Sequence, residues 1–143
     1  MTKMSFKEKI TSDEVDIEYE KGNINLKKVT RKAEKLSFIN IDTPDMKDPV
    51  AIPPLRLVFS DNLSIEFSRR RFSLPFYHRN MDYDELIICL KGKALWETET
   101  GNFELNEGEM LIIPRGIAHR PVNPSQDYTA LEIKYKNKLT FSK

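Results

Sequence analysis

The sequence contains little cysteine, glycine or histidine, and it lacks a long apolar run. Its single cysteine, Cys89, excludes an intramolecular disulfide and a cysteine-rich zinc site. The apolar residues around Cys89 predict a buried, unreactive thiol. No stretch approaches the ~18 consecutive apolar residues of a membrane-spanning helix, and the charged first residues differ from a secretory signal. We therefore expect a cytoplasmic protein.

An excess of one charge is also missing. Lys and Arg total 23, Asp and Glu total 22, and the formal net charge is +1. This balance provides no broad electrostatic surface for nucleic acid or an anionic membrane, so we expect neither as a partner. The 143 residues suit one domain with a real hydrophobic core. Any specificity for a small molecule must come from a local site.

The first 54 residues predict an irregular polar arm. Residues 14–20 alternate weakly between apolar and polar types, which favours a strand, whereas 27–35 fits a short helix and a strand equally well. Four prolines mark 42–54 as a loop. We expect this arm and loop, residues 1–54, to pack on the domain that follows.

From residue 55 onward the pattern becomes one of short alternating strands. Apolar residues recur at every second position over 55–59 and 63–67, which predicts a hairpin with one buried face. Further short strands follow, and four of the five glycines fall in the turns between them. Such regular short strands favour an all-β sandwich or barrel. We place the barrel at 55–136 and a C-terminal tail at 137–143.

Two spaced motifs contain the residues best suited to chemistry. The first consists of His78, Asn80, Glu85 and Gly92, and the second of Gly108, Pro114, Gly116, His119 and Asn123. Strand residues two apart point the same way, so His78 and Asn80 can face one interior. Glu85 opens the next strand and His119 enters from a third. Two imidazoles and one carboxylate are typical of non-haem iron(II) sites with open coordination positions.

In order and spacing these motifs resemble those of the cupin superfamily. The resemblance implies an all-β, single-domain cupin, a double-stranded β-helix or jelly-roll barrel with the polar arm attached. Cupins generally bind a metal through three histidines and a glutamate, which here implies His78, Glu85 and His119 as ligands. Asn80 stands where the second histidine usually lies, so its amide oxygen is a candidate weak fourth ligand, or water takes that place. The first motif also has Phe72 where a glycine is expected.

Iron(II) is the favoured ion, although manganese, nickel and zinc accept the same ligands. A degenerate site without metal is the alternative, because a polar residue on a barrel strand is often only hydrogen-bonded. Both histidines of the chain nevertheless fall on ligand positions, together with a glutamate that is costly to bury.

Three stretches, 77–85, 96–101 and 113–120, are similar to the N-terminal cupin half of the homogentisate 1,2-dioxygenase family. Members of that family are larger two-cupin iron enzymes that cleave an aromatic ring with O₂, and their catalytic iron belongs to the other half. This chain has one cupin motif pair. The resemblance therefore implies ancestry and fold more firmly than it implies the substrate.

The sequence leaves three functions open. The first is a metal-dependent, dioxygenase-like enzyme acting on a small aromatic or carboxylated molecule. The second is a non-catalytic small-molecule-binding or structural cupin with a metal-free site. The third is a sugar isomerase or epimerase, for which no further histidine or lysine base stands out. Resemblance to small cupins also implies a homodimer paired through edge strands. The residues near the motifs that are candidates for lining a substrate pocket are Arg71, Tyr77, Tyr83 and Trp96.

Overall fold

The computed structural model describes residues 6–11, 16–21, 31–37, 54–140 and 142. The chain divides into two compact units, Met1–Leu36 and Ser37–Lys143. In the first unit, β1 (Phe6–Thr11) and β2 (Asp16–Lys21) pair as an antiparallel hairpin. The strand predicted from the alternation at 14–20 is thus confirmed as β2.

Two predictions for the arm concern segments that lie partly or largely outside the described residues. Residues 31–37 form neither helix nor strand, and the remainder of 27–35 lies outside the described residues. The predicted proline-rich loop at 42–54 also lies outside them, apart from Pro54. Within the described ranges, the structure has no helix long and apolar enough to cross a membrane.

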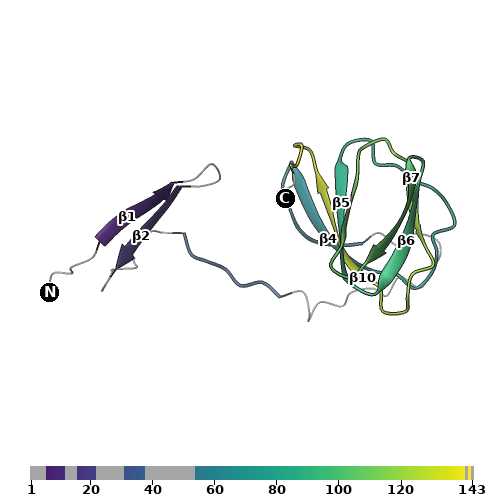
Figure 1. The fold of residues 1–143 in the computed structure, drawn as a ribbon, viewed down its shortest axis with the longest axis horizontal. Helices are drawn as coiled ribbons and strands as arrows, with labels where there is room; N and C mark the ends of the chain where they lie inside the picture. The colour runs from purple at the N-terminus through teal and green to yellow at the C-terminus, as the bar shows by residue number, and fades with distance from the viewer. Residues whose placement is uncertain (1–5, 12–15, 22–30, 38–53, 141, 143) are drawn as a thin grey trace. The chain divides into compact units, whose positions relative to one another are not determined.

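The second unit is a barrel of two antiparallel sheets (Figure 1). One sheet has the order β3-β4-β10-β5-β8 and the other the order β7-β6-β9. The all-β fold expected from the sequence is confirmed. The barrel strands are β3 (Leu55–Phe59), β4 (Leu63–Arg69), β5 (Asp84–Lys91), β6 (Lys93–Thr98), β7 (Gly101–Asn106), β8 (Met110–Ile113), β9 (His119–Val122) and β10 (Thr129–Tyr135).

The turn between β5 and β6 requires a glycine. Gly92 has a positive φ of 74°, in the left-handed region that other residues rarely adopt. A side chain at this position would collide with Ser125 Oγ and come within 2.9 Å of Tyr128 Cα. This turn therefore packs tightly against the chain that leads into β10.

An apolar core fills part of the barrel interior. It contains Cys89, whose side chain is buried as predicted and whose thiol pKa is raised by that burial. The Trp96 indole donates a hydrogen bond to the Tyr128 hydroxyl at 3.2 Å, which satisfies both buried polar groups. The core residues are Ile87, Cys89, Ala94, Trp96, Leu105, Leu111, Ile113, Tyr128 and Ala130.

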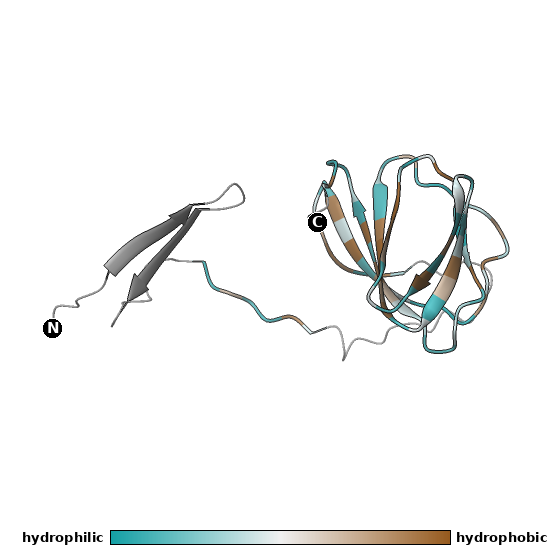
Figure 2. Ribbon diagram, in the orientation of Figure 1, coloured by the Kyte–Doolittle hydropathy of each residue, from teal (hydrophilic) through white to brown (hydrophobic). Residues whose placement is uncertain are grey.

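The remaining part of the interior is polar. Along β4 the buried alternate residues are Ser64, Glu66 and Ser68, and on β10 Glu132 is buried opposite them. Hydrophobic and hydrophilic residues alternate along the barrel strands, as Figure 2 shows. The hairpin predicted at 55–67 is therefore present, but the expected burial of its apolar face is wrong: Phe67 is buried, whereas Phe59 and Leu63 are exposed. A period of two identifies two faces without saying which of them is enclosed.

Candidate functional site

A backbone bridge brings the two histidines together. The His78 N–H donates to the His119 carbonyl at 3.1 Å, and the His119 N–H donates to the His78 carbonyl at 2.9 Å. Residues paired directly across antiparallel strands point their side chains to the same face. The two imidazole centroids are accordingly 4.4 Å apart, with a 58° angle between the rings.

Glu85 reaches His119 from β5. Its Oε2 atom lies 2.8 Å from Nε2 of His119, and the two side chains are 5% and 2% exposed. Nevertheless, Glu85 Oε2 has no well-aligned hydrogen-bond donor within the described residues. The contact is short without having the direction of a hydrogen bond.

The hydrogen bond of the other ring nitrogen, Nδ1, determines whether Nε2 of His119 carries a proton. Nδ1 lies 2.8 Å from the Ile117 carbonyl oxygen, and a carbonyl can only accept, so Nδ1 carries a proton. In the neutral ring, Nε2 then has no proton although it lies 2.8 Å from a carboxylate oxygen. Two lone pairs at this distance repel one another. The pair therefore requires either a second proton on the ring or a cation beside both atoms.

The two imidazoles have pKa values shifted in opposite directions. Burial lowers the pKa of His119, but the contact with Glu85 and its negative charge outweigh burial and raise the pKa above 6.5. Burial, and then the positive charge of His119, lower the pKa of His78 below 6.5. The Nδ1 atom of His78 is buried and has no hydrogen-bond partner among the described residues. The lowered pKa favours the neutral form of His78, and its Nδ1 atom is unused among the described residues.

Asn80 stabilises the turn that joins His78 to Glu85. Its Oδ1 atom accepts hydrogen bonds from the backbone N–H groups of Asp82 and Tyr83, each at 3.0 Å. Two backbone donors thus already engage the oxygen that was assigned as a weak fourth ligand. The residue also lines the cavity beside His78. Its role as a ligand stays a prediction.

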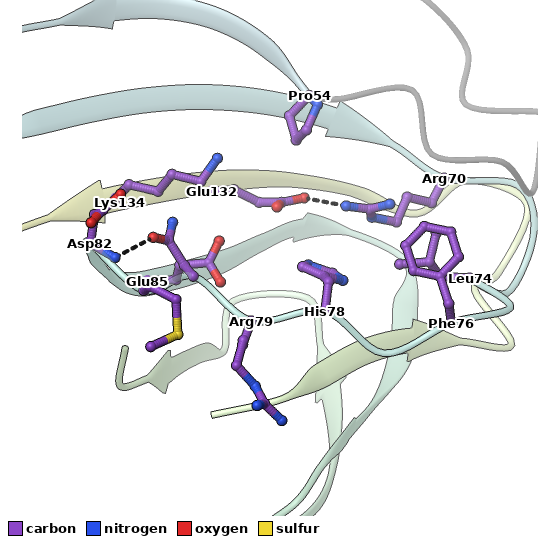
Figure 3. A pocket seen from close by; sticks show the side chains of 12 residues that line it. Pro54, Arg70, Leu74, Phe76, His78, Arg79, Asp82, Glu85, Glu132 and Lys134 are labelled. Atoms are coloured by element: carbon purple, nitrogen blue, oxygen red, sulfur yellow. Dashed lines mark hydrogen bonds and ion pairs between the residues drawn. The ribbon is translucent and has the colours of Figure 1, made fainter. Parts of the chain in front are cut away.

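A cavity of about 530 Å³ adjoins His78 and Glu85 (Figure 3). Figure 3 shows His78 between Arg70 and Glu85, with the Arg70–Glu132 ion pair drawn above it. The lining combines apolar and charged side chains. These are Pro54, Arg70, Leu74, Phe76, His78, Arg79, Asn80, Met81, Asp82, Glu85, Glu132 and Lys134.

One buried and one partly buried ion pair join β4 and its continuation to β10. Arg70 contacts Glu132 at 3.1 Å, and Lys134 contacts Glu66 at 2.8 Å. Burial raises the pKa of Glu132, but the charge of Arg70, hydrogen bonds from Ser68 and Arg70, and the charge of Lys134 together outweigh burial and hold the pKa below its ordinary value. The Nε atom of Arg70 has no hydrogen-bond partner in the described part of the chain. A polar donor of the cavity lining is therefore still available.

Three of these charged residues, Glu66, Glu132 and Lys134, were missed by the sequence reasoning. The sequence does contain a signal for them, because polar residues occupy every second position at 64, 66 and 68 in β4 and at 132 and 134 in β10. The apolar residues at the intervening positions gave a more familiar pattern, and the hairpin prediction was based on them. Polar residues spaced two apart on neighbouring strands of a barrel predict a polar interior as readily as a solvated exterior.

The four predicted pocket candidates lie outside the lining of this cavity, as the described residues define it. Arg71 lines a different surface depression. Tyr77 is half exposed, and the Arg120 guanidinium lies 4.4 Å from its ring. Tyr83 lies beneath Lys136, whose Nζ is 5.2 Å from the ring centroid. Trp96 is 1% exposed and belongs to the apolar core, with its ring 6.0 Å from that of His119.

The three predicted metal ligands, His78, Glu85 and His119, lie near one another, but their side chains do not all point to one common position. In the described ranges, no group of three His, Cys, Asp or Glu side chains is arranged to hold a metal ion. Two atoms that bind one ion at about 2.1 Å and at right angles lie about 3.0 Å apart, which is close to the Glu85–His119 separation. The misaligned contact and the unused nitrogen of His78 both fit the chemistry of a divalent cation.

Comparisons with known proteins agree with the fold. Residues 70–133 match the model of the cupin domain family. Over 71 residues, 49% of this chain, the sequence is 35% identical to "Putative dioxygenase SSO1533" of Saccharolobus solfataricus. That match covers 18% of the relative, so the chain corresponds to less than a fifth of its length.

Solved structures with the same fold are less similar in sequence. One, titled "putative mannose-6-phosphate isomerase" from Ralstonia eutropha JMP134, has a TM-score of 0.57 at 23% identity and covers 73% of this chain and all of its own. A cupin-2 domain containing protein from Shewanella frigidimarina has a TM-score of 0.51 at 21% identity, over 59% of this chain and 80% of that one. At these identities the likeness concerns the fold alone. The strand order, the motif spacing and the matched family model together support a cupin fold for residues 70–133.

Proposed function

We propose that this barrel binds a divalent metal ion through His119, Glu85 and His78 and acts on a small molecule held in the adjoining cavity. The observation that supports it is the Glu85–His119 contact, which is buried, only 2.8 Å long, and not aligned as a hydrogen bond. A divalent cation would replace the repulsion of two lone pairs with attraction to both. Iron(II) is the favoured ion because two imidazoles and a carboxylate are typical of its oxygen-using sites.

The reaction we propose is dioxygenase-like. A relative 35% identical over half of this chain has the name of a dioxygenase, which supports that class without identifying a substrate. When bound, the metal would supply the centre at which O₂ and substrate meet. The resemblance to homogentisate dioxygenases stays a prediction.

The chain's own residues would bind and orient the substrate. Leu74 and Phe76 provide an apolar wall, and the free Nε–H of Arg70 provides a donor for a carboxylate or carbonyl oxygen. Glu132 holds the Arg70 guanidinium in place through their ion pair. A volume of about 530 Å³ lies in the range of small-molecule sites. These features support a small substrate that has both an apolar and an acidic part.

Metal analysis of untagged protein tests the proposal. We expect the parent to bind one iron(II) or related ion per chain and His119→Ala to lose it, with any oxygen consumption lost in parallel. Arg120→Ala is the matched control, because Arg120 neighbours His119 on β9 but pairs with Glu97 away from the cavity. It should retain the metal. A parent that takes up no iron, manganese, nickel or zinc on reconstitution would rule the proposal out.

The metal-free binding module is the second candidate. The observation that favours it is the raised pKa of His119, since a protonated ring would form a buried ion pair with Glu85 and need no metal. Nitrogen NMR of the imidazole in metal-free protein would show both ring nitrogens protonated at neutral pH in that case. The isomerase hypothesis gains no support, because the structure titled as an isomerase is only 23% identical in sequence and shares the fold alone.

A further inference from the structure

A second depression, separate from the cavity at His78, lies where β4 and β5 end and β10 begins. Its volume is about 650 Å³, which lies in the range of small-molecule sites. Three cationic side chains line it, Arg69, Arg71 and Lys91, together with one carboxylate, Asp127. As the described residues define the two, no residue lines both the depression and the cavity. We call this second site the cationic depression.

Strand pairing places two of these cations in one row. Arg69 is opposite Thr129, and Thr129 is opposite Lys91, so the row crosses β4, β10 and β5. Residues directly opposite one another on antiparallel strands have their side chains on the same face. The next residue of β10, Ala130, is buried in the core, so the row faces out of the barrel. The backbones of β4 and β5 are two strand spacings apart, roughly 9.6 Å, so both long cationic side chains can meet over Thr129.

A β-bulge in β5 turns Lys91 to this outward face. Ala130 is opposite Cys89 and Thr129 is opposite Lys91, which leaves Leu90 as an extra residue. Without the extra residue, alternation would direct Lys91 to the interior together with Cys89. The Cys89 thiol lies 3.5 Å from the Lys91 carbonyl oxygen and donates a weak hydrogen bond to it, which stabilises the bulge from inside the barrel. Bulges often re-aim a side chain beside a functional site.

The two cations of the row have no carboxylate to neutralise them. Within the part of the chain that the structure describes, neither Arg69 nor Lys91 forms an ion pair. The Arg69 guanidinium instead lies 5.3 Å from the ring centroid of Phe67. By contrast, the cations that face the interior, Arg70 and Lys134, each contact a carboxylate. Because β4, β10 and β5 are inner strands of the sheet, the outward cations do not protect an exposed edge.

The Asp127 carboxylate offsets only part of the positive charge. It accepts a hydrogen bond from the Ser125 hydroxyl at 2.8 Å, beside the turn at Gly92. With three cations and this one carboxylate, the lining has an excess of two positive charges. The whole chain has a formal net charge of +1, so the excess is a local feature. Such a concentration of charge attracts an anion.

We propose that the cationic depression binds the phosphate group of a small molecule. At neutral pH a phosphate monoester has a charge of about −1.5 to −2, which matches the excess, and its oxygens accept from both a guanidinium and an ammonium group. A monocarboxylate would neutralise only half of it. Leu90, which is 42% exposed in the same lining, provides an apolar contact for the rest of the molecule. The site is independent of the proposed metal centre, so either proposal can fail without the other.

An NMR titration of the full-length chain with phenyl phosphate and with inorganic phosphate tests the proposal. We expect the backbone amide signals of Lys91 and Thr129 to shift and to saturate with both ligands. Phenyl phosphate should bind more tightly than inorganic phosphate, because its ring can contact Leu90. Benzoate, which has the ring but one negative charge, should bind more weakly than phenyl phosphate.

Substitutions that remove one cation at a time sharpen the test. Lys91→Gln and Arg69→Gln should each weaken phenyl phosphate binding at least about tenfold, because each removes a charged contact with the phosphate. Lys93→Gln is the matched control, since Lys93 is two residues from Lys91 but pairs with Glu104 outside the depression. It should bind phenyl phosphate as the parent does. Circular dichroism checks that the variants fold.

Three results would overturn the proposal. One is a parent without saturating shifts at Lys91 and Thr129 up to about 10 mM phenyl phosphate, which would leave an acidic segment of another protein as the occupant. The second is a set of shifts confined to the cavity beside His78. The third is a loss of affinity in Lys93→Gln equal to that in Lys91→Gln, which would indicate a general effect of charge. If Arg69→Gln does not fold, Lys91→Gln alone provides the comparison, with the same outcomes.

Discussion

The inner and outer faces of the same sheet present opposite chemistry. On the inner face, Glu66 and Glu132 are buried, while their outward neighbours Ile65 and Ile133 are partly exposed. An antiparallel sheet that covers a simple hydrophobic core has the reverse arrangement. The interior of this barrel is therefore not organised for packing alone. Its charges need partners, which Arg70 and Lys134 supply across the strands.

The largest expected effect comes from breaking the inner Arg70–Glu132 pair. Arg70→Met should lower the free energy of unfolding by about 3–5 kcal/mol, because it leaves the Glu132 carboxylate buried without its cation. The double variant Arg70→Met/Glu132→Leu should recover much of that loss. Denaturant unfolding of both variants measures this. A single-variant cost below about 1 kcal/mol would mean that water already solvates these charges, and the contrast between the faces would disappear.

Neighbouring isoleucines on β8 compare the two faces directly. Ile113→Ala should cost about 2–5 kcal/mol, since Ile113 is 2% exposed in the apolar core. Ile112→Ala should cost less than about 1 kcal/mol in dilute monomer, because Ile112 points outward. Thermal and denaturant unfolding at low concentration distinguish the two. Equal costs would show that the outward residue is packed within the chain.

The smallest effect is a pH dependence of stability. Burial raises the pKa of Glu132, but the charges of Arg70 and Lys134 and the hydrogen bonds to the carboxylate together lower it below its ordinary value in the folded protein. A carboxyl group with a lowered pKa contributes stability that is complete above its unfolded pKa and is lost as the pH falls through its folded pKa. We expect the unfolding free energy of the parent to decline more steeply than that of Glu132→Gln below pH 4.5. Parallel curves between pH 7 and pH 3 would contradict this assignment.

Much of the fold was predictable because its signals are local. Alternation, turn glycines and motif spacing sufficed for an all-β barrel and for the neighbourhood of His78, Glu85 and His119. Long-range partners were not predictable in this way. Arg70 and Glu132 are 62 residues apart, and only the pairing of β4 with β10 makes them neighbours.

The aromatic pocket candidates illustrate the same limit. Tyr77 is next to His78 in sequence, but adjacent residues on an extended chain point to opposite sides, and Tyr77 hydrogen-bonds Glu97 instead. Trp96 does face the interior, but at a level occupied by the apolar core. Proximity in sequence to a ligand motif therefore says little about access to the cavity. Whether a side chain reaches the cavity depends on the register of its strand.

The backbone bridge between His78 and His119 fixes the spacing of the two imidazoles independently of the side chains that form the cavity wall. Because two main-chain hydrogen bonds set the spacing of the imidazoles, exchanging Phe76 or Leu74 for other apolar residues would reshape the cavity and leave that spacing intact. Inserting a single residue between His78 and Glu85 is a different event, since it would disturb the turn in which Asn80 accepts hydrogen bonds from the backbone of Asp82 and Tyr83. The barrel can thus acquire new ligand preferences by point substitution while the spacing of its histidines is inherited unchanged.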